Sequence, residues 1–162
     1  MVEWPYWVIL TGIAVAAVPI GLTAGRAHPH GARTNGAWVA FGVVALGALV
    51  FHCVAMFLPR LVPPVGPLPA AADEIRALGL PSQLAYWLPA TLLVAALRRL
   101  PPVAVTALAG VLVGVGVTMF WPFPLAVHLA FIAAAVGTLA GLVGMALGQA
   151  SARPARDGSL TA

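Results

Sequence analysis

Residues 37–58 read AWVAFGVVALGALVFHCVAMFL, a run that contains no Asp, Glu, Lys or Arg. A helix of this length is about 33 Å long, slightly more than the hydrocarbon core of a bilayer, which is about 30 Å thick. The stretch therefore predicts a membrane-spanning helix. How often such stretches recur decides the class of the whole chain.

The composition indicates a membrane protein throughout. Of the 162 residues, 62% are hydrophobic and 7% are charged, whereas soluble domains carry about 25% charged residues. Such a chain cannot cover itself with a polar surface, so membrane lipids must be its main surroundings. The bias toward Ala, Gly, Pro, Val and Arg suggests a bacterial source. We therefore expect an all-α integral membrane protein of the bacterial inner (cytoplasmic) membrane.

Five stretches are long and apolar enough to span the bilayer, and none contains a charged side chain. They cover residues 4–24, 37–58, 82–97, 102–120 and 124–149. The sequence thus predicts one domain, residues 1–150, built as a bundle of five transmembrane helices. The polar residues 151–162 are expected to form a disordered cytoplasmic tail.

The distribution of arginine predicts the orientation of the bundle. Cytoplasmic loops are enriched in basic residues. If the N-terminus is outside, the inner loops carry Arg26, Arg33, Arg98, Arg99, Arg153 and Arg156, and the outer side carries Arg60 and Arg76. The arginines therefore predict a chain with its N-terminus outside and its C-terminus inside. They are scattered and form no basic stripe, so we expect no nucleic-acid partner.

The external loop, residues 59–81, is the longest connection. Its first half is rich in proline, and its second half predicts a short interfacial helix with Asp73 and Glu74 in the first turn. Ile75 and Leu78 would share one apolar face of this helix. That face is expected to lie on the outer membrane surface or against a partner.

Small residues at helical spacing predict where spans pack closely. Gly110 and Gly114 form a GxxxG motif on the fourth span. The fifth span carries two further rows, Gly137 with Gly141 and Gly144 with Gly148. One interpretation is a dimer interface. The other, which we favour, is that the fourth and fifth spans pack on each other, because only a short WPFP turn joins them.

Two histidines within the spans are the candidate functional residues. His52 lies about 9 Å below the outer end of its span and His128 about 6 Å below the same side, at 1.5 Å per residue. Met56 shares the helical face of His52, and Met119 ends the fourth span at a similar level. Imidazole and thioether groups are ligands suited to haem iron or copper.

Three interpretations of this cluster remain open. His52 and His128 could ligate a b-type haem, with Met56 or Met119 as a substitute ligand; the same side chains could hold copper; or the imidazoles could bond to backbone, water or a quinone head group. The first two make the chain a subunit or accessory factor of a membrane redox (respiratory-type) complex. The third favours a cofactor-free structural or assembly subunit that docks another integral membrane protein.

Other function classes have less support. Ion-coupled carriers usually place a charged residue within the membrane, and these spans have none. The sequence contains no HExxH, GxSxG or Walker-type loop, so we do not expect an enzyme acting on its own. A passive permease component is the weakest alternative. The expected partners are membrane lipids and other integral membrane subunits.

Overall fold

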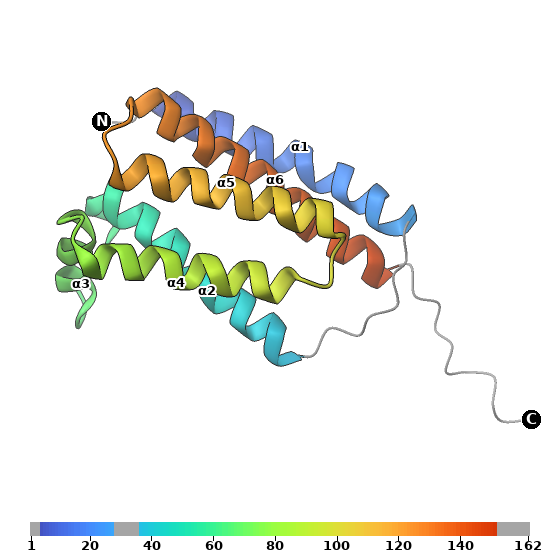
Figure 1. Cartoon of the computed structure of the whole chain (residues 1–162), viewed down its shortest axis with the longest axis horizontal. Coiled ribbons are helices and arrows are strands. Elements are labelled where there is room, and N and C mark those ends of the chain that lie inside the picture. Colours follow the sequence, from blue (N-terminus) through green and yellow to red (C-terminus); the bar gives the residue numbers. More distant parts are fainter. Residues whose placement is uncertain (1–3, 28–35, 152–162) are drawn as a thin grey trace, which may run out of the picture.

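A computed structural model describes residues 4–27 and 36–151, and these residues form helices and no strand. The helices are α1 (Trp4–Ala27), α2 (Gly36–Phe57), the 3₁₀ turn η1 (Pro59–Leu61), α3 (Leu68–Arg76), α4 (Leu80–Leu97), α5 (Pro102–Phe120) and α6 (Leu125–Ser151) (Figure 1). The predicted tail beyond Ser151 lies outside the described residues.

Five of these helices, α1, α2, α4, α5 and α6, are long and apolar enough to cross a membrane. Each predicted span coincides with one of them, and no end differs by more than three residues. Prolines mark several of the starts: Pro81 lies in the first turn of α4, Pro102 begins α5 and Pro124 directly precedes α6. Proline suits the first turn because its fixed φ is helical and the N–H it lacks would have no partner there.

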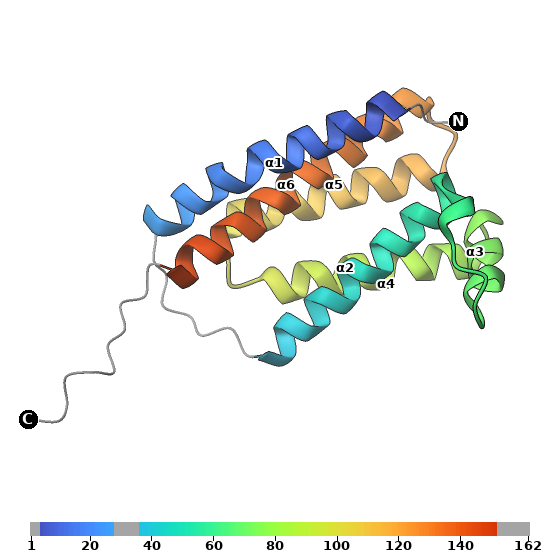
Figure 2. The ribbon, with the colours of Figure 1, turned by 180° about the vertical axis from the view of Figure 1, so that it is seen from behind.

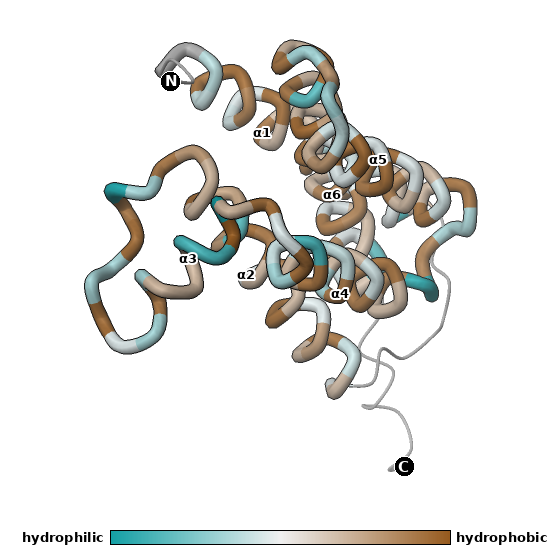
Figure 3. Tube along the Cα trace, turned by 60° about the vertical axis from the view of Figure 1, so that its left-hand side comes forward, coloured by the Kyte–Doolittle hydropathy of each residue, from teal (hydrophilic) through white to brown (hydrophobic). Residues whose placement is uncertain are grey.

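The five long helices form an open arc rather than a closed ring. α1 packs on α6, α6 on α5, α5 on α4 and α4 on α2. α1 and α2 are therefore the two ends of the series, and within the described residues they share no extended packing surface. Figures 2 and 3 show α1 and α6 together on one side of the molecule and α2 with α4 on the other.

One end of the bundle carries a cap, defined as residues 58–79, which includes η1 and α3 (Figure 1). Ala72 and Ile75 of α3 are buried with Ala55 of α2, and Ala85 of α4 packs against the same cluster. The apolar face of α3 therefore lies against the bundle itself.

Two details of the predicted cap helix are wrong. α3 begins at Leu68, so Asp73 and Glu74 lie in its second half rather than its first turn. Leu78 lies beyond the end of the helix, with φ of 55°, and is exposed, so it does not share the buried face of Ile75. Proline in the first turn of α3 starts the helix earlier than the acidic residues suggest.

The closest helix contact in the bundle joins the first and last spans, α1 and α6. A Cβ added to Gly144 of α6 would collide with the backbone of Val18 in α1, and one added to Gly148 would collide with that of Leu22. From the α1 side, Gly21 and Gly25 are pressed against the backbone of α6 in the same way. We call this contact the glycine seam.

The favoured interpretation of the glycine rows is therefore only partly correct. Gly114 does lie against α6, at the ring of Phe131. However, both rows of α6, Gly137 with Gly141 and Gly144 with Gly148, face α1 instead of α5. Gly110 contacts nothing within 4 Å of the position a Cβ would take. Spacing identifies a close contact but not the helix that makes it.

We expect Gly144→Ala to lower the free energy of unfolding by about 1–3 kcal/mol, because its methyl group would push α1 away from α6. The matched control is Gly110→Ala, where the methyl group meets open space and helix propensity favours alanine by up to about 1 kcal/mol. Unfolding of the detergent-solubilised protein, titrated with a denaturing detergent, measures both. Equal effects of the two substitutions would contradict the glycine seam.

Candidate functional site

His52 is fully buried in α2, with 0% of its surface exposed. The buried face of α2 comprises Ala45, Leu49, His52 and Ala55, which recur at intervals of three and four, so one helical stripe carries them all. The Nε2 atom of His52 lies 3.2 Å from the sulfur of Met119 on α5. The ring of Tyr86 on α4 meets the imidazole edge-on, with centroids 5.6 Å apart.

His128 near the start of α6 is also buried, with 6% of its surface exposed. Its Nδ1 atom lies 2.8 Å from the hydroxyl oxygen of Thr118 on α5. That hydroxyl donates to the carbonyl of Gly114 at 2.7 Å. The His128 imidazole, the Thr118 hydroxyl and the Gly114 carbonyl thus form a short hydrogen-bond chain, whose direction follows the tautomer of the ring.

The two imidazoles thus contact consecutive residues of α5: His128 of α6 contacts Thr118, and His52 of α2 contacts Met119. Phe57 at the end of α2 reaches the His128 ring, with centroids 5.9 Å apart. No hydrogen bond or ring contact joins His52 to His128 within the part of the chain that the structure describes. Both histidines lie at the same end of the bundle, as the sequence predicts, but each contacts a different residue of α5.

The structure brings together only two of the four candidate ligands. His52 and Met119 are in contact. Met56 packs instead against the cluster of Ala55, Ala72 and Ile75 beneath α3. Met56 lies one helical turn after His52 in the sequence, but this spacing does not show that its side chain packs against α3.

Sequence reasoning missed Ser82 and Tyr86. The Tyr86 hydroxyl donates to the carbonyl of Leu112 at 2.6 Å and so ties α4 to α5. Ser82, one helical turn earlier on α4, is fully buried. Its Oγ and the Nδ1 of His52 are buried polar atoms for which the described residues provide no hydrogen-bond partner. The sequence signal for this pair is its spacing: Ser82 and Tyr86 are four residues apart and so share one face of α4.

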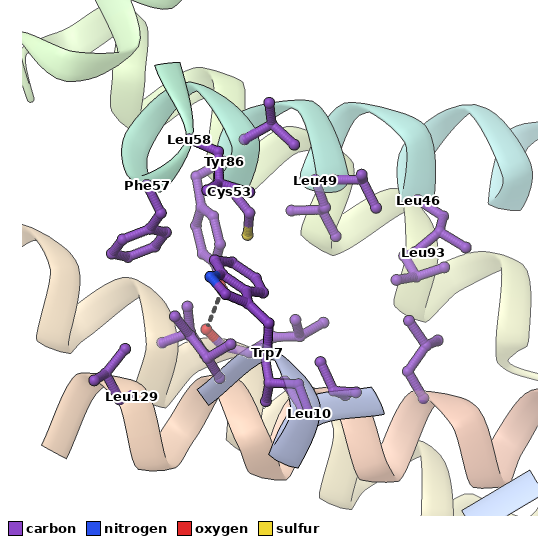
Figure 4. A pocket seen from close by; sticks show the side chains of 18 of the residues that line it. Trp7, Leu10, Leu46, Leu49, Cys53, Phe57, Leu58, Tyr86, Leu93 and Leu129 are labelled. Atoms are coloured by element: carbon purple, nitrogen blue, oxygen red, sulfur yellow. Dashed lines mark hydrogen bonds between the residues drawn. The ribbon is translucent and has the colours of Figure 1, made fainter. Parts of the chain in front are cut away.

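A cavity of about 260 Å³ lies inside the arc, and it was not anticipated from the sequence either. Its walls come from all five long helices, and almost every atom that faces it is apolar. Figure 4 shows Trp7 of α1 and the sulfur of Cys53 of α2 pointing into this space. Neither His52 nor His128 lines it.

The geometry of the two histidines favours copper over haem as a possible ligand. An imidazole nitrogen beside a thioether sulfur is a soft donor pair of the kind that Cu(I) accepts. A bis-histidine haem needs both imidazoles to face one slot, and the structure gives that arrangement no support. Among the described residues, no group of three or more His, Cys, Asp or Glu side chains is placed to hold a metal ion.

No protein-family model matches the chain, and no curated protein or solved structure is significantly similar to it. Its function must therefore be argued from the geometry.

Proposed function

We propose that the chain is a structural or accessory subunit that docks another integral membrane protein through its cap, in the cytoplasmic membrane of a bacterium. The observation that carries this proposal is a set of large apolar side chains exposed on the cap, outside the spans. They are Leu61, Val65 and Leu78, with exposed fractions between 41% and 66%.

Exposed apolar side chains within the spans need no explanation, because lipid surrounds them. On the cap the surroundings are water and lipid head groups, where large exposed apolar side chains favour an interaction site. Burying one Leu or Val side chain fully is worth about 1.5–3 kcal/mol. Arg60 and the Asp73–Arg76 ion pair are exposed on the same cap, and protein interfaces commonly combine apolar residues with polar ones at their edge.

The arginine distribution supports placing the cap outside the cell. Arg26 lies in the last turn of α1 and Arg98 follows α4, both at the end of the bundle opposite the cap. The guanidinium of Arg98 lies 4.3 Å from the ring centre of Trp38, an aromatic residue at the start of α2. Basic and aromatic residues together are typical of a membrane interface, and the basic side is usually cytoplasmic.

Copper binding by His52 and Met119 is the second candidate function. The contact of 3.2 Å between Nε2 and the sulfur joins α2 to α5, with His52 fully buried and Met119 partly buried. Polar side chains in membrane interiors are often functional, and imidazole and thioether are both side-chain types that bind copper. A copper site here would fit a docking partner that belongs to a redox complex.

For docking, we expect a photo-crosslinking residue at Val65 to form an adduct with one integral membrane protein. The double substitution Leu61→Ser with Val65→Ser should reduce co-purification of that protein by about tenfold or more. The control is Val103→Ser at the opposite end, where the native side chain is 82% exposed. Adducts to lipid alone, or equal losses in both variants, would exclude docking through the cap.

For orientation, we expect a cysteine at Val65, introduced with Cys53→Ala, to react with a membrane-impermeant maleimide in intact cells. A cysteine at Arg98 in the same background should react only after the cells are lysed, because it lies on the cytoplasmic side. The reverse pattern would invert the bundle and place the cap in the cytoplasm.

For copper, we expect the purified protein to bind one Cu(I) ion per chain in a competition titration with a chromogenic chelator. Met119→Leu should abolish this binding, whereas Met56→Leu should retain it, because Met56 packs elsewhere. A reduced-minus-oxidised visible spectrum of the same samples tests for haem. Copper binding that survives in Met119→Leu, or no binding at all, would remove this candidate.

A further inference from the structure

We propose that the cavity inside the arc binds one acyl chain of a membrane phospholipid, which enters between α1 and α2. This inference goes beyond the docking function and does not depend on it. It rests on where the cavity lies, what its walls offer and what surrounds its opening.

The cavity lies within the spans and is reached from the side. Its walls include residues from both ends of the arc, Trp7 and Leu10 from α1 and Leu46 and Val50 from α2. These two helices share no extended packing surface within the described residues. Val50 lines the cavity and is also 54% exposed, so it stands at the rim. The opening therefore faces the hydrocarbon core of the bilayer.

The walls can accept a hydrocarbon and little else. The only hydroxyls among the lining residues, those of Tyr6 and Tyr86, already donate to the carbonyls of Leu129 and Leu112, each at 2.6 Å. A water molecule needs two to four polar partners to occupy a cavity, and these walls provide almost none. Apart from the indole N–H of Trp7, no strong donor among the lining side chains remains for the carbonyls of a quinone.

The gain on filling the cavity comes from packing rather than from leaving water. Lipid tails are as apolar as leucine, so transfer from the bilayer brings no hydrophobic gain. An empty cavity, however, deprives its lining atoms of dispersion contacts. Apolar cavities of about 150 Å³ already bind benzene, and this one is larger, about 260 Å³. A flexible chain that is present at the opening at all times is the natural occupant.

A positive charge at the cap end of the cavity favours a phospholipid. Leu58, which follows α2, lines the cavity at the cap end, and exposed Arg60 comes two residues later in η1. A guanidinium at this level of the membrane attracts a phosphate head group. The head group would remain at the membrane surface while one acyl chain occupies the cavity.

Ala135 and Ala134 provide a matched pair of substitutions for the test. Ala135 lines the cavity, whereas its neighbour Ala134 is exposed on the outside of α6. We expect native mass spectrometry of the full chain, washed in detergent and then given phosphatidylglycerol, to show one tightly bound lipid. Ala135→Phe should weaken this binding by about tenfold or more, because the ring fills the cavity, and Ala134→Phe should not.

The single cysteine allows a second measurement that needs no cavity-filling variant. Cys53 lines the cavity, so phosphatidylglycerol should slow its alkylation by N-ethylmaleimide several-fold in delipidated wild-type protein. The control combines Cys53→Ala with Val44→Cys on the lipid-facing side of α2, and its reaction rate should not change.

Failure of the lipid to protect Cys53 would overturn the proposal, as would equal lipid binding by the Ala135→Phe and Ala134→Phe variants. A quinone found in place of the phospholipid in protein purified from its own membrane would overturn the identity of the ligand. Because none of these measurements involves the cap, their failure is distinguishable from failure of the docking proposal.

Discussion

The arrangement of the bundle depends on the glycine seam between α1 and α6. In lipid there is no hydrophobic gain from bringing two apolar helices together, so association relies on close packing of their surfaces. Gly21 and Gly25 on one helix and Gly144 and Gly148 on the other let the two backbones touch. Any side chain at these positions would force the helices apart. The seam thus joins the two spans that are farthest apart in the sequence.

The remaining packing follows from this pairing. α6 uses one side for α1 and another for α5, and α5 continues to α4 and α2. Because α1 is committed to α6, it does not close the ring against α2. The open arc, and with it the cavity, is the consequence. Polar contacts near the cap end then fix the register, since His52 and His128 hold consecutive residues of α5 from two sides.

The spans could be predicted from the sequence because the criterion is local: a stretch must be long enough and free of charge. The helix on which each span packs could not be predicted, because a glycine row has the same sequence pattern whichever helix it faces. The rows on α6 were assigned to its neighbour in sequence, whereas their partner is α1. The start of α3 was misplaced for a similar reason, because proline in its first turn outweighs the placement of two acidic residues.

The candidate site shows the same limit. The sequence predicted a common level for His52, His128 and Met119, and the structure places these residues around the last turn of α5. It could not tell that Met56 packs under α3, because two neighbouring helices compete for that side of α2. The cavity had no signal in any one segment, since its walls are assembled from five helices.

Neighbouring residues of α2 serve the two candidate sites. His52 faces α4 and α5, whereas Cys53 faces the cavity, as expected for positions about 100° apart on a helix. α2 therefore presents an imidazole to α4 and α5 on one side and a thiol to the cavity on another. Packing on one side of a helix fixes its rotation and hence the direction of side chains on the other. An acyl chain beside Cys53 would accordingly hold α2 in the rotation that keeps His52 against Met119. The cavity and the His52–Met119 contact are in this sense one structural unit, built around α2, which among the described long helices packs extensively only on α4.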